Sequence, residues 1–307
     1  MLRQARHAII RTLWEDYRLG SQQMQRIEQG LQQKGSPKLI LDHFAIIDLP
    51  GPNTGIPTLR DLFSCLGYTE HGKGYLADKQ NDFLWMAESD AIDLPATEAL
   101  PQVVVADFRP HELPVDVRMI IEKYAGAAKP APLARIQQLA TLAASGDANA
   151  ANALHDAFTQ YISARSWPLP SSHEFETVHA WNKLLAWVLV FGRRPNHFTL
   201  SLHHLDCFES IDAFHQYVEQ ELQLPLNHEG GKIKGNITTG IAQGSTIGTP
   251  QPVQLADGTI ELPLGFVEFV WRFPRQQTNA TPTKWNDYFT GFVAQHADHV
   301  IESLTTP

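Results

Sequence analysis

Two histidines occupy matching positions at the start of two apolar runs that lie far apart in the chain. His43 belongs to the sequence DHFA (residues 42–45), and His197 belongs to the similar sequence NHFT (residues 196–199). Such a repeat is expected when two parts of a chain adopt the same fold, and each run would then be the first strand of its unit. Related units can bring equivalent side chains to one shared cavity. We therefore predict that His43 and His197 bind the same metal ion.

A carboxylate in a third apolar run could complete this metal site. Glu268 lies inside GFVEFVWRF (residues 265–273), where an ionised side chain costs several kcal/mol to bury unless it is paired or binds a metal. Two imidazoles and one carboxylate form the ligand set of non-haem Fe(II) oxygenases, and zinc hydrolases can use the same set. An alternative remains open, because Arg272 would lie on the same side of a strand as Glu268 and could pair with it.

The other histidines fit a shared metal site less well. His203 and His204 are adjacent, so they would point to opposite faces of a strand, about 20 Å from His197 if the strand stays extended. The sequence HADH (residues 296–299) has helical spacing, but no acid or base pattern lies near it, which indicates an exposed helix face. We expect surface or helix-capping positions for three more histidines, His71, His173 and His179.

Composition indicates a soluble globular protein and excludes several classes. The 307 residues are 43% hydrophobic and 19% charged, and the formal net charge of −9 argues against a nucleic-acid surface. The apolar stretch at 184–192 is too short to cross a membrane, and the charged N-terminal segment does not have the pattern of a signal peptide. Cys65 and Cys207 cannot form a disulfide framework. We therefore predict a cytoplasmic protein with reduced cysteines.

The order of helix-like and strand-like segments predicts one α+β domain. Apolar residues at helical spacing and Ala-rich stretches indicate helices, and short β-branched runs between turn residues indicate strands. Two β-α-β-β-β units are expected to form one barrel-like sheet of mixed and antiparallel strands. The predicted segments are N-terminal helices in 1–37, the first unit in 38–110, a central helical insert in 111–192, the second unit in 193–275 and a C-terminal helix in 276–307.

Several motifs along nearly the whole chain resemble one enzyme family. The chain is similar to the 2-oxoadipate dioxygenase/decarboxylase family, also called hydroxyglutarate synthases, which is related to the vicinal oxygen chelate metalloenzymes. The long central segment is the most specific part of this resemblance, because no generic fold requires it. The motifs are LWEDYR, DHFAI, SWPLPSSHEFETVHAWNKLLAWVLVFGRRPNHFTL, IKGN, QGSTIG, VEFVWRF and ADHVIES.

The resemblance implies a specific ligand set and reaction. It implies that Fe(II) is held by the histidine of DHFA, the histidine of NHFT and the glutamate of VEFV, which are His43, His197 and Glu268. The implied partners are a 2-oxo acid and O₂, with no nucleic acid and no membrane. From 2-oxoadipate, an acid of lysine catabolism, the implied products are 2-hydroxyglutarate and CO₂.

The chain departs from the family pattern at one position that bears on the substrate. The resemblance implies an arginine four residues after the first histidine, where it would bind the distal carboxylate of the substrate, but Ile47 occupies this position. Isoleucine cannot form an ion pair with a carboxylate. Polar residues of the second unit could supply another anchor, and the candidates for substrate binding are Lys234, Gln243, Ser245, Thr246 and Arg272.

Two other functions use the same residues differently. A zinc-type hydrolase or lyase could use His43, His197 and Glu268 as ligands without needing O₂. In a non-catalytic small-molecule binding protein, the three side chains would only pack against one another. The sequence leaves the substrate, the stereochemistry of the product and the oligomeric state open.

Overall fold

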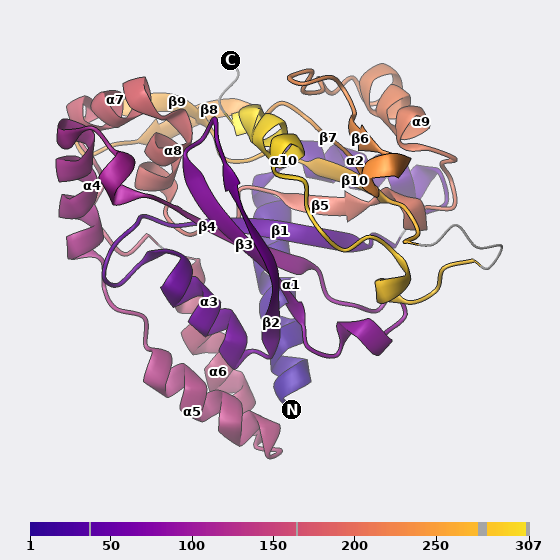
Figure 1. Cartoon of the computed structure of the whole chain (residues 1–307), viewed down its shortest axis with the longest axis horizontal. Helices are drawn as coiled ribbons and strands as arrows, with labels where there is room; N and C mark the ends of the chain where they lie inside the picture. The colour runs from indigo at the N-terminus through magenta and orange to yellow at the C-terminus, as the bar shows by residue number, and fades with distance from the viewer. Residues whose placement is uncertain (37, 164, 276–280, 305–307) are drawn as a thin grey trace.

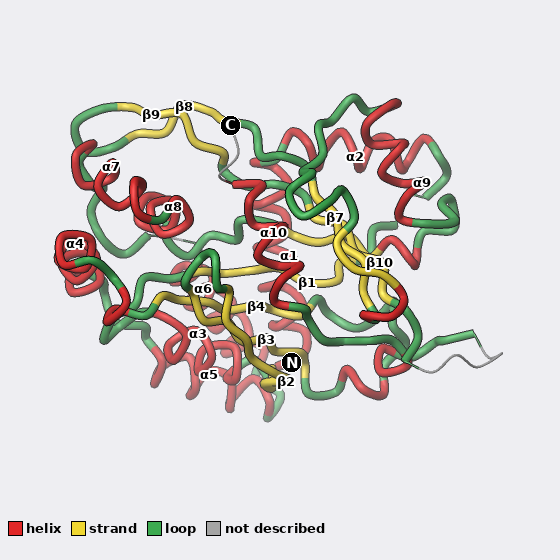
Figure 2. The backbone as a smooth tube through the Cα atoms, turned by 45° about the horizontal axis from the view of Figure 1, so that its top comes forward, coloured by secondary structure: helices red, strands yellow, loops and turns green. Residues whose placement is uncertain are grey.

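One mixed eight-stranded sheet forms the centre of the molecule, with helices on both faces (Figure 1). The computed structural model describes residues 1–36, 38–163, 165–275 and 281–304. The strand order is β2-β3-β4-β1-β5-β10-β7-β6, and the sheet curls into a half-barrel (Figure 2). This architecture confirms the predicted α+β class.

Two β-α-β-β-β units lie side by side in the sheet and have matching internal order. The first strand of each unit pairs in parallel with the last strand of that unit, and the two first strands pair antiparallel in the middle of the sheet. The first unit is β1 (Leu41–Ile47), α3 (Gly55–Cys65), β2 (Tyr68–Leu76), β3 (Asn81–Glu88) and β4 (Gln102–Phe108). The second unit is β5 (Phe198–Ser201), α9 (Ile211–Gln216), β6 (Lys234–Asn236), β7 (Ile241–Ser245) and β10 (Glu268–Arg272).

The second unit contains an insertion that the sequence pattern did not separate. The run TIELPLGFVEFVWRF (residues 259–273) divides into two strands that belong to different sheets. β9 (Thr259–Pro263) pairs only with β8 (Pro250–Gln254) in a two-stranded hairpin, whereas β10 lies in the main sheet. The break falls where Pro263 and Gly265 interrupt the strand, because proline has no N–H to donate to a partner strand.

Helices cover the sheet on both faces, which explains why its central strands are apolar without a clear alternation. One face packs on α1 (Leu2–Gly20), α2 (Gln22–Gln33), α3, α5 (Leu133–Ala144) and α6 (Ala148–Ile162). The other face packs on α4 (Val115–Ala127), α7 (Ser172–Trp181), α8 (Lys183–Phe191) and α10 (Ala294–Ile301). The side chains of β1 divide between the two cores: Phe44 and Ile46 belong to the first, and Ile47 belongs to the second.

Short helical turns complete the described secondary structure. The 3₁₀ turns are Ala91–Asp93, Pro110–Glu112, Leu202–His204, Ile237–Thr239, Trp285–Asp287 and Glu302–Leu304, and a π-helical turn spans Tyr217–Glu221. His203 and His204 therefore lie on a turn after β5. The sequence analysis had assumed an extended strand for these two residues, and that assumption is wrong.

The C-terminal segment is less helical than predicted. We expected a helix within 276–307, but α10 begins only at Ala294, and 276–280 and 305–307 lie outside the described residues. Pro282 and Gly291 disfavour a continuous helix before that point. Figure 2 shows α10 crossing over the strands of the sheet, so this helix covers the concave side of the half-barrel.

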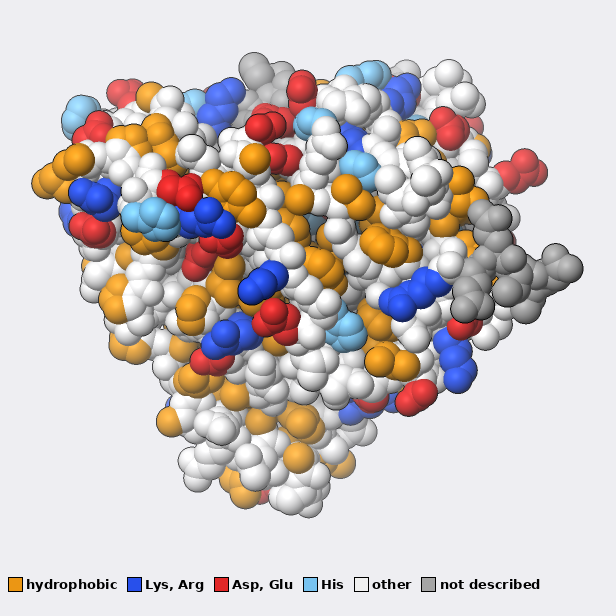
Figure 3. All heavy atoms as spheres, viewed as in Figure 1, with side chains coloured by type: hydrophobic (Ala, Val, Ile, Leu, Met, Phe, Trp, Pro, Cys, Tyr) orange, Lys and Arg blue, Asp and Glu red, His pale blue; other side chains and the backbone are white. Residues whose placement is uncertain are grey.

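On the face shown in Figure 3, Lys and Arg side chains are interspersed with acidic ones and form no single basic patch. Within the described ranges, no helix has both the length and the apolar character needed to cross a membrane.

Candidate metal centre

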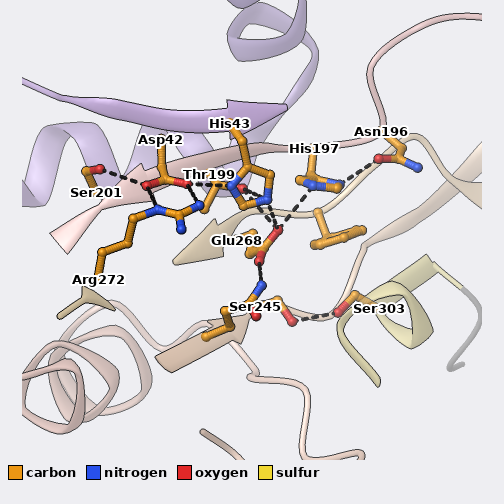
Figure 4. A network of polar contacts seen from close by, with 12 residues as sticks. Asp42, His43, Asn196, His197, Thr199, Ser201, Ser245, Glu268, Arg272 and Ser303 are labelled. Carbon is orange, nitrogen blue, oxygen red and sulfur yellow. Dashed lines mark hydrogen bonds and ion pairs between the residues drawn. The ribbon is translucent and has the colours of Figure 1, made fainter. Parts of the chain in front are cut away.

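Three neighbouring strands bring the predicted ligands together on the concave side of the sheet (Figure 4). His43 lies on β1, His197 directly precedes β5, and Glu268 is the first residue of β10. Nε2 of His43 and Nε2 of His197 lie 3.2 and 3.1 Å from the same atom, Oε2 of Glu268. All three residues are buried, and one ligand atom from each lies within 4.8 Å of the others. This group could hold one metal ion.

The residue before each histidine orients the imidazole ring. Nδ1 of His43 lies 2.7 Å from Oδ1 of Asp42, and Nδ1 of His197 lies 2.6 Å from Oδ1 of Asn196. Since both partners are oxygen acceptors, each Nδ1 is assigned as the N–H donor, which directs each Nε2 towards Glu268. The repeated D/N-H pair is therefore a candidate ligand with its positioning group. The sequence analysis recognised the repeat but gave Asp42 and Asn196 no role.

Asp42 is itself fixed by a buried ion pair that crosses the sheet. Arg272 donates from Nε to Oδ2 of Asp42 at 2.6 Å and from Nη2 to Oδ1 at 2.8 Å. Nη1 of Arg272 donates to the carbonyl oxygens of Phe289 and Gly291 at 2.7 and 3.0 Å. The guanidinium is thus fully engaged with Asp42 and the backbone. The alternative in which Arg272 pairs with Glu268 is excluded.

Two further polar side chains hold the carboxylate of Glu268. Nε2 of Gln243 donates to Oε1 at 2.7 Å, and Oγ1 of Thr199 donates to Oε2 at 3.0 Å. The same hydroxyl oxygen lies 3.1 Å from Nε2 of His43. Both oxygens of Glu268 are therefore oriented by neighbouring strands, β7 and β5. Thr199 was missed by the sequence analysis, because its position opposite Glu268 depends on the register of β5 and β10.

The charged groups of the site shift one another's pKa values. Burial acts to raise the pKa of Glu268, but His43 and His197 outweigh it and lower the pKa well below its ordinary value. Burial acts to lower the pKa of His43, but Glu268 and Asp42 raise it to about 9. For His197, burial outweighs the effect of Glu268 and lowers the pKa. The two imidazoles are thus not equivalent electrostatically, although their positions in the two units match.

Of the five predicted substrate-binding residues, the structure places Gln243 in the wall of the cavity beside the metal group. The other four are outside this wall and bind protein groups. Lys234 Nζ donates to Asn227 O at 3.0 Å, Ser245 Oγ lies 2.9 Å from Ser303 Oγ, Thr246 Oγ1 donates to Gln23 Oε1 at 2.7 Å, and Arg272 binds Asp42.

The cavity is small and mostly apolar. Its volume is about 60 Å³, and its wall includes Ile47, Phe83, Val104 and Leu184. The wall also includes three residues of α10, namely Ala297, Val300 and Ile301. Such surroundings exclude water from the metal group and strengthen the electrostatic interactions inside it.

The matching strand registers show why only one unit supplies a carboxylate. Ala45 lies two residues after His43 and pairs with Val104, whereas Thr199 lies two residues after His197 and pairs with Glu268. Val104 therefore occupies in the first unit the place that Glu268 occupies in the second. The three candidate ligands thus leave one side of the group facing an apolar wall, where a substrate could approach.

Comparison with known proteins identifies relatives along most of the chain. A sequence model of the family described as 2-oxoadipate dioxygenase/decarboxylase matches residues 9–275. A relative from Arabidopsis thaliana, a chloroplastic 2-oxoadipate dioxygenase/decarboxylase, is 26% identical over 275 residues, which cover 87% of this chain and 68% of the relative.

Solved structures share the fold. The structure of hydroxyglutarate synthase from Oryza sativa, in complex with 2-oxoadipate, matches with a TM-score of 0.78 and 23% identity over 96% of this chain and 90% of that chain. A glyoxalase-superfamily protein from Ralstonia eutropha matches with a TM-score of 0.74 and 17% identity over 87% of this chain and 82% of that one. These matches confirm the predicted vicinal oxygen chelate-like fold.

Proposed function

The chain belongs to the 2-oxoadipate dioxygenase/decarboxylase family, and from this premise we propose that it is an Fe(II)-dependent enzyme that decarboxylates a 2-oxo acid with O₂. The products are CO₂ and a 2-hydroxy acid that is one carbon shorter than the substrate. The C1 carboxylate of the substrate leaves as CO₂. One oxygen atom of O₂ enters the new carboxylate and the other enters the new hydroxyl group.

The observation that carries this proposal is the approach of two imidazoles and one carboxylate to a common point on three adjacent strands. The donor set of two nitrogens and one oxygen suits Fe(II) and leaves further coordination positions open. Fe(II) bound there would supply the redox chemistry with O₂ that amino-acid side chains lack. His43, His197 and Glu268 would hold the ion.

Each remaining residue of the site has a role that follows from its contacts. Asp42 and Asn196 keep the Nε2 atoms of the two histidines directed into the site, and Gln243 and Thr199 orient Glu268. The apolar wall keeps water away from the reacting carbon atoms. These residues orient the three candidate ligands, and the fold supplies a pocket in which a bound acid would be held in a fixed orientation.

The direct test is oxygen uptake by protein loaded anaerobically with Fe(II). With a panel of 2-oxo acids, we expect uptake of O₂ and release of CO₂ in equal amounts. His43→Ala, His197→Ala and Glu268→Ala should each abolish both signals and the binding of iron. His228→Ala is the matched control, because this histidine is exposed on the surface and should leave activity unchanged.

Other outcomes separate the alternative functions. Turnover that persists without O₂ in zinc-loaded protein would indicate a hydrolase or lyase. Failure of the purified protein to take up either metal would indicate a binding protein. The cytoplasmic location and a role in lysine catabolism remain predictions from the sequence.

A further inference from the structure

One polar side chain in the wall of the cavity takes no part in the metal group. Asn81, the first residue of β3, lines the cavity and is 1% exposed. Neither Nδ2 nor Oδ1 of Asn81 has a hydrogen-bond partner. Gln243, the other amide in the wall, donates to Glu268. A buried amide without partners is unfavourable in a folded protein, so both atoms of Asn81 are available to a bound ligand.

The strand registers place Asn81 far from the metal group. Gln102 is the partner of His43 on β4, and Phe108 is the partner of Asn81 on the same strand. The six residues from position 102 to position 108 correspond to about 20 Å along a strand. The side chains of His43 and Asn81 both reach into one cavity and shorten this gap, so the part of a bound acid that can contact Asn81 is its tail and not its metal-bound end.

The shape of the cavity limits what can span this distance. A volume of about 60 Å³ is small compared with the several hundred Å³ of most ligand sites. The wall of this small cavity includes Glu268 and Gln243 of the metal group and also Leu76 and Asn81, whose strand positions lie far from that group. Such a space fits one unbranched chain better than a branched or aromatic one.

The far end of the cavity offers no positive charge to a ligand. The described residues of its wall include no lysine or arginine. Buried cations in the surrounding structure are engaged elsewhere: Lys79 with Glu302, Arg193 with Asp48, Arg272 with Asp42, and Lys234 with the carbonyl oxygen of Asn227. A carboxylate buried beside Asn81 would lose its hydration without gaining a cationic partner, which is strongly unfavourable.

We propose that Asn81 recognises the far end of a straight-chain 2-oxo acid, and that this end is an uncharged hydrogen-bonding group such as a hydroxyl or a carboxamide. The carboxamide of Asn81 can both donate and accept, so it matches a group that does the same. This inference rests on the proposed function and specifies its substrate class. It places selection of the substrate tail on β3, at the opposite end of the cavity from the metal ligands.

The test compares three acids of equal chain length with Fe(II)-loaded protein. The acids are 2-oxohexanoate with a methyl end, 6-hydroxy-2-oxohexanoate with a hydroxyl end, and 2-oxoadipate with a carboxylate end. We expect kcat/KM from oxygen uptake to be about tenfold higher for the hydroxyl end than for the methyl end, as one buried hydrogen bond implies. The carboxylate end should give the lowest value. Anaerobic titration calorimetry should give the same order of affinity.

The variant Asn81→Leu assigns this preference to one residue. It should reduce the advantage of the hydroxyl end over the methyl end to less than about twofold, mainly through KM, while kcat for 2-oxohexanoate is kept. Phe83→Leu is the matched control, because Phe83 is the next inward-facing residue of β3 and should alter the three acids by similar factors. Iron content and thermal melting report folding, and Asn81→Ala serves as a second variant if Asn81→Leu does not fold.

The outcomes separate this inference from the proposed function. A wild-type preference for 2-oxoadipate over both other acids would overturn the inference and leave the dioxygenase function intact. Full retention of the hydroxyl preference in both Asn81 variants would also overturn it. Absence of oxygen uptake with every acid in the presence of bound iron would overturn the proposed function, and the inference would fall with it.

Discussion

Phe44 and Phe198 are Cα partners across the central strand pair, and their rings stack with centroids 4.8 Å apart. Each phenylalanine directly follows a metal-ligand candidate, so their pairing on one face of the sheet places His43 and His197 on the other. The two imidazole centroids are 5.7 Å apart. The stacked pair in the core thus sets the spacing of the two histidines in the site.

Truncation of this stacked pair should destabilise the whole sheet. We expect Phe44→Ala and Phe198→Ala each to lower the free energy of unfolding by about 3–5 kcal/mol, because both side chains are fully buried. Chemical denaturation measures the effect. The double variant should lose less than the sum of the single variants, since the second truncation removes a contact already lost. Phe208→Ala, at a partly exposed position, should cost less, and an equal loss there would contradict this explanation.

The ion pair behind His43 should control metal affinity without contacting the metal. Removing Asp42 leaves the Nδ1 atom of His43 without its acceptor and leaves Arg272 buried without its anionic partner. We expect Asp42→Ala to weaken iron binding by about 10–100-fold, as found for groups that orient metal-bound histidines. Arg272→Lys should have a smaller effect in the same direction, because lysine keeps the charge but loses the two-pronged geometry.

A surface pair provides the control for this prediction. Arg109 binds Asp82 through the same two-pronged geometry, but both side chains are about one-third exposed. Arg109→Lys should leave iron affinity unchanged, because exposed ion pairs contribute little and this one lies outside the site. Equal iron affinity in wild type and Asp42→Ala, measured by anaerobic titration, would show that His43 needs no positioning group.

The position of Ile47 in the cavity wall allows the substrate preference to be reversed. Ile47→Arg would introduce a cation into a site that is 4% exposed, so we expect a lower melting temperature in the absence of ligand. The ratio of kcat/KM for 2-oxoadipate to that for 2-oxohexanoate should rise at least about tenfold, because a carboxylate end would gain a paired charge. Added 2-oxoadipate should restore part of the lost thermal stability. Ile47→Leu, which adds no charge, should leave the ratio near its wild-type value.

The carboxyl group of Asp107 on β4, which contacts the start of α3, should make the fold less stable above neutral pH. Burial raises the pKa of Asp107 from 3.8 to about 6, although the N–H of Ile56 donates to its Oδ2. Below pH 3.8 the group is protonated in both the folded and the unfolded chain, so it has no effect there. As the pH rises through 6, the unfolded chain ionises more readily and folding loses stability.

The variant Asp107→Asn removes this titration while keeping an oxygen that can accept from Ile56. We expect it to raise the free energy of unfolding by on the order of 2 kcal/mol above pH 7, and the gain should disappear near pH 4. Denaturation at a series of pH values measures the difference. Asp61→Asn, on the exposed side of α3, should change stability by less than about 0.5 kcal/mol. A gain for Asp107→Asn that does not vary with pH would have another cause.

The two-unit architecture and the metal-ligand group could be derived from residue types and order. The D/N-H-F repeat located the two first strands, and Glu268 stood out because an acid in an apolar strand needs a partner. Both features are local in the sequence, so they can be recognised without knowing which strands pair. Strand types in the first unit were also predictable, because turn residues separate its runs clearly.

The contacts that tune the site depend on strand order and register, which the sequence does not reveal. Asp42 and Arg272 are 230 positions apart and meet only because β1, β5 and β10 are neighbours. From the sequence alone, Asn81 looks like an ordinary turn residue at the start of a strand. Only the structure shows that its side chain faces the cavity. The strands buried on both faces lack the alternation that would have indicated which side chains point to the site.

The unlike residues at the matched places of Val104 and Glu268 divide the work of the site between the two units. Apart from His43, the first unit supplies much of the wall that a substrate tail would touch, whereas the second unit supplies the acid and the residues that orient it. Paralogues descended from one ancestor could therefore exchange their preferred acids through changes near Ile47 and Asn81 alone. The metal group would be inherited unchanged while the preferred substrate diverged.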